Sequence, residues 1–162
     1  MEDATFNKLR REEKMVIKRF EDVEGWKEAR ILAQMIYSLS RKGKFKSDFG
    51  LRDQMCRAVV SISSNIAEGF ESASNAEFVR FLCYSRRSAA EVKSQLYVAL
   101  DNGYITQDEF DRLYAKTTSV SKLITAFIKY LRSRGARTTH LPASRTENQK
   151  PTTDNRKLKT EN

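Results

Sequence analysis

The amino-acid sequence predicts an all-α protein, an antiparallel up-down-up-down four-helix bundle with a disordered basic C-terminal tail. Apolar residues recur at helical spacing in four segments within residues 20–133. The connections between these segments are short, and short connections favour antiparallel neighbours. No stretch shows the sustained alternation of apolar and polar residues that is typical of a half-buried strand.

The chain divides by composition into a charged N-terminal arm (residues 1–19), the bundle (20–133) and the tail (134–162). The arm carries six Lys/Arg against four Asp/Glu, the bundle seventeen against fourteen, and the tail seven against three. Nearly half of the net charge of +9 therefore lies in the last 29 residues. A basic arm indicates a polyanionic partner or, equally well on composition alone, a solubilising extension.

The first helix is expected over residues 23–41, because Trp26, Ala29, Ala33 and Ile36 share one face. Gly43 then supplies a left-handed stop. The second helix is expected over residues 49–70, with Gly69 marking its end.

Capping boxes predict the starts of the third and fourth helices. Ser74 with Glu77 begins the third helix, which ends at Asn102 and Gly103. Thr106 with Glu109 begins the fourth, whose periodicity is lost past residue 132. The tail beyond it holds both prolines and many polar residues, so it cannot bury enough apolar surface to order itself.

The residues offer little for catalysis, so we expect no enzyme, no cofactor and no metal site. The single histidine, His140, lies in the tail, and Cys56 and Cys83 show neither pairing nor metal spacing. These two cysteines favour buried free thiols in a reducing cytosol, and no apolar run is long enough to cross a membrane. An enzyme would need Asp53, Glu68 or Glu91 as a general base.

Polar residues interrupt the apolar stripe of the second helix in the stretch SNIAEG, residues 64–69. We interpret them as a seam of small and polar residues that sets helix register or forms a subunit contact, because buried polar groups must be hydrogen-bonded. The seam comprises Ser61, Asn65, Glu68 and Gly69, with Arg86, Arg87 and Glu91 expected opposite them on the third helix.

The same segments resemble a known family. The stretches FEDVEGWKEARILAQMIY, FGLRDQMCRAVVSISSNIAEGF and FVRFLCYSRRSAAEVKSQL are similar to the four-helix-bundle proteins encoded in intervening sequences of bacterial 23S rRNA genes. The resemblance covers about residues 20–133, and the Asn-Ile-Ala-Glu-Gly core at 65–69 is its specific part. Ser63 stands where the family usually has Pro, and Arg87 where it often has Gly.

The resemblance implies a cytoplasmic homopentamer without known catalysis. Related bundles are accessory variability proteins of diversity-generating retroelements, so it also implies a reverse transcriptase as a possible partner, with RNA or DNA. A structural or protein-interaction scaffold with no direct role on nucleic acid is the alternative.

We expect phosphates to bind mainly at the pole of the bundle from which both termini leave, together with the tail. The cations assigned to this surface are Arg10, Arg11, Lys14, Lys18, Arg19, Arg132, Arg134, Arg137, Arg145, Lys150, Arg156, Lys157 and Lys159. Several tails in one oligomer would add their weak contacts together.

Overall fold

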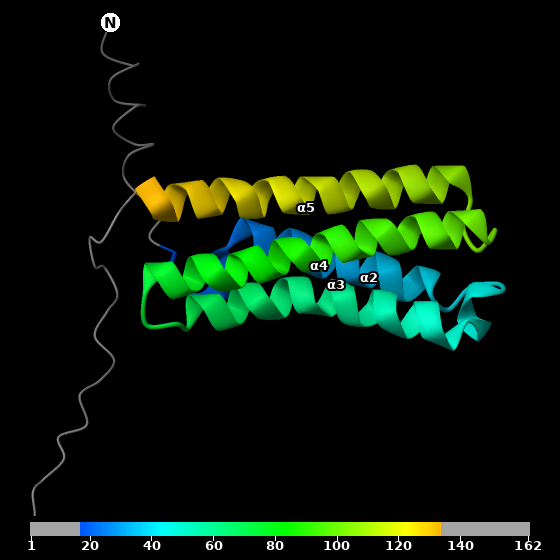
Figure 1. Cartoon of the computed structure of the whole chain (residues 1–162), viewed down its shortest axis with the longest axis horizontal. Helices are drawn as coiled ribbons and strands as arrows, with labels where there is room; N and C mark the ends of the chain where they lie inside the picture. Colours follow the sequence, from blue (N-terminus) through cyan, green and yellow to red (C-terminus); the bar gives the residue numbers. More distant parts are fainter. Residues whose placement is uncertain (1–16, 134–162) are drawn as a thin grey trace, which may run out of the picture.

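The computed structural model describes residues 17–133. Four long helices run side by side: α2 (Glu24–Leu39), α3 (Phe49–Phe70), α4 (Asn75–Asp101) and α5 (Gln107–Ser133) (Figure 1). Two short 3-10 turns, η1 (Phe20–Asp22) and η2 (Phe45–Ser47), precede α2 and α3. Residues 1–16 and 134–162 lie outside the described residues. The prediction that the tail is disordered concerns these residues.

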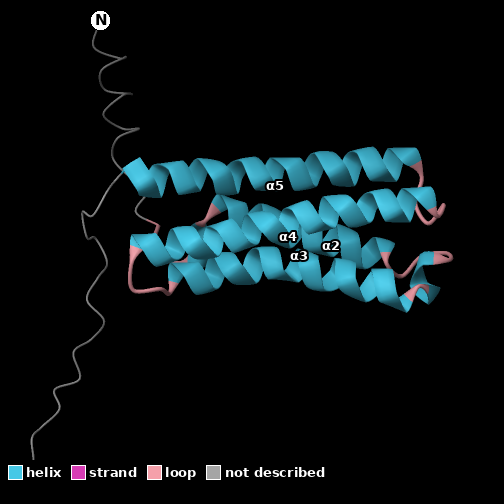
Figure 2. Ribbon diagram, viewed as in Figure 1, coloured by secondary structure: helices cyan, strands magenta, loops and turns pink. Residues whose placement is uncertain are grey.

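Each helix runs antiparallel to the next, as predicted. α2 contacts α3 and α5, and α4 contacts α3 and α5, so the four helices enclose a single core. The described part of the chain holds helices and turns but no strand (Figure 2). One end of the bundle gathers the start of α2, the end of α3, the start of α4 and the end of α5.

The predicted apolar stripes form the core. Leu32, Ile36, Ile62, Leu82 and Ile124 are all at most 1% exposed. Along the last two helices the stripe predicted from spacing is buried at nearly every position. These side chains interlock in one cluster because helical periodicity brings them to the same side of each helix.

The helix ends follow the predicted local chemistry. Gly43 and Gly103 have positive φ angles of 49° and 65°, as left-handed stops require. The Thr106 box is reciprocal, since the Glu109 N–H donates to Thr106 Oγ1 and the Thr106 N–H donates to the Glu109 carboxylate. Ser74 accepts from the Glu77 N–H in the same way. Asp48, which the sequence analysis did not single out, caps α3 by accepting from the Leu51 N–H.

Gly69 differs from its predicted role as a helix stop. It lies inside α3, which continues to Phe70, and its φ is not positive. It is buried against α4, and the structural reason for a glycine there is the approach of the two helices, described below.

Candidate nucleic-acid interface

The polar stretch of α3 is hydrogen-bonded within the protein. Asn65 Nδ2 donates to the Ser61 carbonyl (2.7 Å) and to Ser61 Oγ (2.9 Å), one turn earlier on the same helix. Ser88 Oγ of α4 lies 3.1 Å from Ser61 Oγ. Ser85, fully buried on α4, donates to the Ile62 carbonyl at 2.7 Å. The serines thus join α3 to α4, and no buried side-chain polar atom of this stretch lacks a hydrogen-bond partner.

Gly69 allows α4 to approach α3 closely. A Cβ atom at this position would lie 2.6 Å from Phe78 Cδ2 and 2.8 Å from Phe81 Cβ. Both distances are shorter than van der Waals contact, so any larger residue must push the helices apart or displace the rings. Gly25, the other buried helix glycine of the described residues, has its nearest such neighbour, Ile124 Cγ1, at 3.5 Å.

The charged residues assigned to the seam lie elsewhere. Glu68, Arg86, Arg87 and Glu91 are all exposed. Glu91 accepts a hydrogen bond from Gln95 Nε2 on its own helix at 3.1 Å. The structure therefore brings together the small and uncharged members of the predicted set and leaves the four charged members on the surface.

Most of the predicted phosphate contacts lie outside the described residues, namely Arg10, Arg11, Lys14, Arg134, Arg137, Arg145, Lys150, Arg156, Lys157 and Lys159. Three are described: Lys18, Arg19 and Arg132, and all are exposed. Arg19 is engaged by Glu21, with 3.0 Å between guanidinium and carboxylate. Lys18 and Arg132 are the predicted cations of this pole that the structure leaves available.

A cationic surface that the sequence analysis missed lies along α4 and α5. From residue 112 to residue 133, α5 carries five Lys/Arg and no Asp/Glu. From residue 78 to residue 100, α4 carries four Lys/Arg and one Glu. α2 and α3 together are balanced, with four of each sign. Averaging charge over the whole bundle hid this asymmetry, which the charge pattern of the last helix alone would have revealed.

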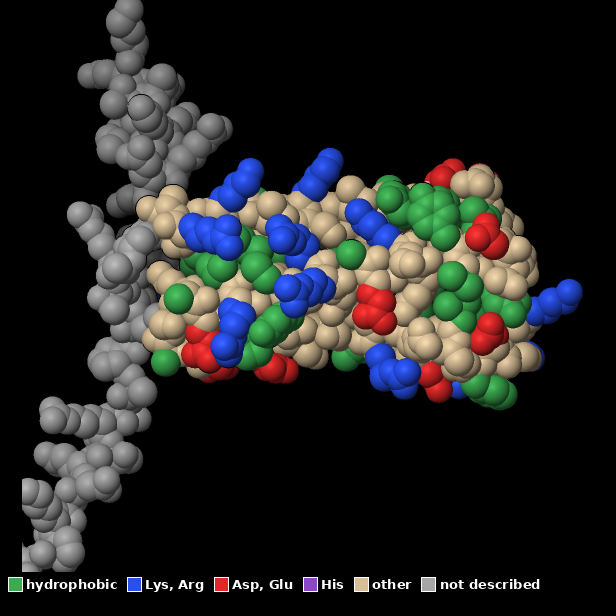
Figure 3. All heavy atoms as spheres, in the orientation of Figure 1, with side chains coloured by type: hydrophobic (Ala, Val, Ile, Leu, Met, Phe, Trp, Pro, Cys, Tyr) green, Lys and Arg blue, Asp and Glu red, His purple; other side chains and the backbone are tan. Residues whose placement is uncertain are grey.

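We define the α4–α5 cationic face by its exposed members, Arg80, Arg86, Arg87, Lys122, Lys129 and Arg132. Ring contacts fix the register of the two helices, with Phe78 against Phe127 near one end and Tyr97 against Phe110 near the other. Residues 80–87 of α4 therefore lie level with the stretch of α5 that contains Lys122. Figure 3 shows blue Lys and Arg side chains gathered over both helices, mostly toward the end where α5 finishes.

Few members of this face have acidic partners. Of the six members of this face, only Arg80 forms an ion pair with a described residue, at 3.4 Å from Glu77. Two further cations of these helices are used inside the bundle. Lys116 pairs with Glu28 of α2, and the Lys93 ammonium lies 5.0 Å from the centre of the Tyr114 ring. The cations that remain unpaired are free to meet an external anion.

The other end of α4 and α5 has a different character. Tyr97, Phe110 and Tyr114 pack ring against ring, with centroids 4.8–5.8 Å apart. Tyr114 raises the pKa of Tyr97 above its ordinary value, chiefly electrostatically, and desolvation adds to the effect. Asp101, Asp108 and Asp111 flank this cluster in the sequence, which makes this end less attractive to a polyanion.

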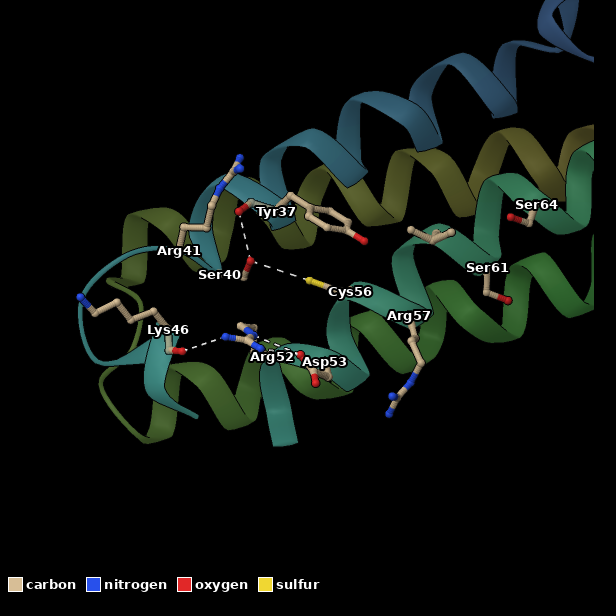
Figure 4. Close-up of a pocket in the computed structure, with 11 residues that line it drawn as sticks. Tyr37, Ser40, Arg41, Lys46, Arg52, Asp53, Cys56, Arg57, Ser61 and Ser64 are labelled. Carbon is tan, nitrogen blue, oxygen red and sulfur yellow. Dashed lines mark hydrogen bonds and ion pairs between the residues drawn. The ribbon is translucent and has the colours of Figure 1, made fainter. Parts of the chain in front are cut away.

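A groove lies between α2 and α3 (Figure 4). Its volume is about 880 Å³, and Tyr37, Cys56 and Val60 supply its apolar lining. The cations on its wall are Arg41, Lys46, Arg52 and Arg57. Arg52 is engaged by Asp53 and by the Lys46 carbonyl, as the dashed lines show. Ser61 and Ser64 also line it. Of the three suggested general bases, Asp53 lines the groove and is paired with Arg52, whereas Glu68 and Glu91 do not line it.

At the opposite end of the bundle from the termini, two basic residues have acidic partners. Lys42 lies 3.9 Å from Glu109, and Arg52 lies 3.0 Å from Asp53. Within residues 17–133, no helix combines the length and the apolar character needed to cross a membrane.

Comparisons with known proteins agree with this architecture. The family model described as 23S rRNA-intervening sequence protein matches residues 21–126. A crystal structure of a protein with unknown function from the S23 ribosomal protein family of Bacteroides thetaiotaomicron superposes with a TM-score of 0.60 and 24% identity, covering 65% of this chain and 98% of that one. At that identity the likeness shows the fold. No curated protein matches the chain.

Proposed function

The chain belongs to the 23S rRNA-intervening sequence protein family, as the resemblance of its sequence indicated, and from this premise we propose that it is a non-enzymatic, oligomeric nucleic-acid-binding accessory protein. The observation that carries the proposal is the α4–α5 cationic face, where five of six exposed cations have no acidic partner among the described residues.

The face suits phosphate groups rather than base edges. Its Lys and Arg side chains are exposed on the outer surface of two helices, where the phosphates of a polymer can reach them. Such contacts release counterions, so the affinity falls steeply as salt rises and depends little on sequence. The predicted basic tail, which lies outside the described residues, adds seven cations to the same electrostatic attraction.

The proposal includes the partners that the family resemblance implies. A homopentamer would present five copies of the cationic face and of the tail, and binding to one polymer would gain strength from their effective concentration. A reverse transcriptase of a diversity-generating retroelement is the protein partner we propose, in the cytoplasm. Light scattering of the full chain measures the assembly size, and co-purification with such an enzyme tests the partner.

The test compares two triple variants of the full chain that remove equal charge. R86Q/K122Q/K129Q removes three cations of the α4–α5 cationic face, and R41Q/K46Q/R57Q removes three from the α2–α3 groove. Binding of a labelled 30-nucleotide oligonucleotide is measured by fluorescence anisotropy across a salt series. The first variant should bind at least tenfold more weakly at low salt, with a salt slope shallower by about two, since each lost contact removes roughly 0.7 of slope for a single strand.

The control variant should bind within about threefold of the unchanged protein, because Arg41, Lys46 and Arg57 line the α2–α3 groove and do not belong to the α4–α5 cationic face. Equal losses in the two variants would show that only the net charge matters and would contradict the assignment of the face. No measurable binding by the unchanged protein at low salt would overturn the proposed function.

The groove between α2 and α3 favours one alternative, a protein-interaction scaffold. Tyr37 and Val60 are 42% and 40% exposed on its walls, which is typical of a surface that another protein covers. Under this alternative the groove variant loses a protein partner while the α4–α5 variant binds as before. Co-purification of the two variants separates these functions.

A further inference from the structure

Along α4, an exposed aromatic ring lies between Arg80 and Arg87, two members of the α4–α5 cationic face. Tyr84 on α4 is 39% exposed, and its ring meets that of Phe81 edge to face, with centroids 6.1 Å apart. Phe81 itself is half-buried and lies where α4 approaches Gly69 of α3. The phenol is thus supported by a ring that is anchored at the tightest helix contact of the bundle.

Arginines lie on both sides of this ring along the helix. Arg80, Tyr84 and Arg87 are spaced by four and three residues, so they share one face of α4. The Arg87 guanidinium carbon lies 5.7 Å from the centre of the Tyr84 ring, and that of Arg80 lies 5.9 Å from the centre of the Phe81 ring. We define Arg80, Phe81, Tyr84 and Arg87 as the arginine–tyrosine ridge.

We infer that the arginine–tyrosine ridge binds single-stranded nucleic acid, with a base stacked on Tyr84 and the flanking arginines on phosphates. This inference rests on the proposed function and narrows its substrate class. Every base has a π-face, so stacking is tolerant of sequence. The bases of a duplex are already stacked on one another, so a ring can insert between them only by unstacking a base step, at a cost of a few kcal/mol.

The second aromatic cluster of the same helices marks the difference between a ring that is merely exposed and a ring placed for stacking. Tyr97 is 49% exposed, more than Tyr84. However, it packs against Phe110 and Tyr114, and the charged residues that flank this cluster in the sequence are mixed, with Asp101, Asp108 and Asp111 against Lys93 and Arg112. Those carboxylates repel phosphates, whereas the neighbours of Tyr84 attract them.

The experiment measures affinities of the full chain for three labelled probes: a 20-nucleotide oligo(dT), a 20-base-pair duplex and heparin, a polyanion without bases. Y84L removes the ring, Y84F keeps it, and Y97L is the matched control at the other cluster. Oligo(dT) affinity should fall about tenfold in Y84L, from the loss of one stacked base, and stay within twofold in Y84F and Y97L. Duplex and heparin affinities should stay within twofold in all three variants. Oligo(U) in place of oligo(dT) should give the same ratios.

Several results would overturn the inference. Equal losses by Y84L on all three probes, or no loss on oligo(dT), would exclude stacking while the proposed function stands. A change of molecular mass in Y84L, measured by light scattering, would assign the ring to a contact between copies and likewise overturn it. Binding of none of the probes by the unchanged protein would refute the inference and the proposed function together. Thermal melting followed by circular dichroism confirms that each variant is folded.

Discussion

The two sides of α4 use polar residues in opposite ways. Toward α3, Ser85 and Ser88 form hydrogen bonds to α3 within the protein. On the outer surface, Arg86 of α4 and Lys122 and Lys129 of the neighbouring α5 are exposed without acidic partners among the described residues. Both sides interrupt an apolar pattern in the sequence, yet the first holds the bundle together and the second remains available to solvent.

This comparison of the two surfaces indicates which polar residues are candidates for function. A polar group whose hydrogen bonds are satisfied inside the protein contributes to register and stability. A cation without a partner adds little to stability and much to the electrostatic field outside the molecule. The variants below separate these two roles, in order of their expected effect on stability.

The largest effect is expected from Gly69→Ala, at the contact of α3 with α4. The added methyl would lie 2.6 Å from Phe78 Cδ2, so the helices must shift, at a cost of about 2–3 kcal/mol in the free energy of unfolding. Urea unfolding followed by circular dichroism measures this loss of stability. Gly25→Ala is the matched control, because its methyl meets Ile124 at 3.5 Å, and it should leave stability unchanged or raise it by up to about 1 kcal/mol. Equal losses in the two variants would contradict the close-approach role of Gly69.

A smaller effect is expected from Ser85→Ala, which removes the buried hydrogen bond to the Ile62 carbonyl. The free energy of unfolding should fall by about 1 kcal/mol. Ser63→Ala is the control, since that hydroxyl is bonded only to the Val60 carbonyl on its own helix, and its change should be near zero. Nucleic-acid affinity should be the same in both variants, and a marked loss of affinity in S85A would place the seam in the binding site.

Glu28→Gln tests the one cation of α5 that α2 neutralises. The side chains of Lys116 and Glu28 are about three-quarters buried. Loss of the ion pair should lower the free energy of unfolding by less than about 1 kcal/mol, and this loss should be smaller at high salt because salt screens the attraction. The freed Lys116 should also strengthen oligonucleotide binding by a small factor at low salt. Weaker binding would show that this part of α5 does not face the polymer.

The smallest effect on stability is expected from Lys122→Gln with Lys129→Gln on the cationic face. Both side chains are exposed without ion pairs, so the free energy of unfolding should change by no more than about 0.5 kcal/mol. The salt slope of oligonucleotide binding should nevertheless become shallower by about one. A large loss of stability would mean that these lysines have a structural role.

Much of the fold follows from local sequence patterns. Apolar spacing predicted the four helices and nearly all core positions, because a helical period places residues three and four apart on one face. Thr106, Gly43 and Gly103 predicted helix ends because capping depends on neighbouring backbone groups alone. The first helix was predicted to reach residue 41 and ends at Leu39, a difference within one turn.

The candidate site was predicted less well. Ser61 of the predicted seam is hydrogen-bonded to Ser88 of α4, and Asn65 is hydrogen-bonded to Ser61. The charged members of the seam are exposed. Helical periodicity could not predict this, because it does not say which residues of another helix lie opposite. Gly69 was predicted both to mark the end of the second helix and to belong to the seam, and the position of Phe78 on α4 explains why a glycine stands at that contact. The α4–α5 cationic face was present as charge runs in two segments and was lost in the average over the bundle.

The sequence by itself determined the four helices, their ends and the excess of positive charge along the last of them, because these depend on residues within one or two turns. Only the tertiary structure decided which cations stay available. Lys116 is neutralised by Glu28, 88 residues away on another helix, whereas Lys122 and Lys129 have no such partner among the described residues. Pairing of that kind depends on antiparallel register, which the packing of side chains from all four helices sets.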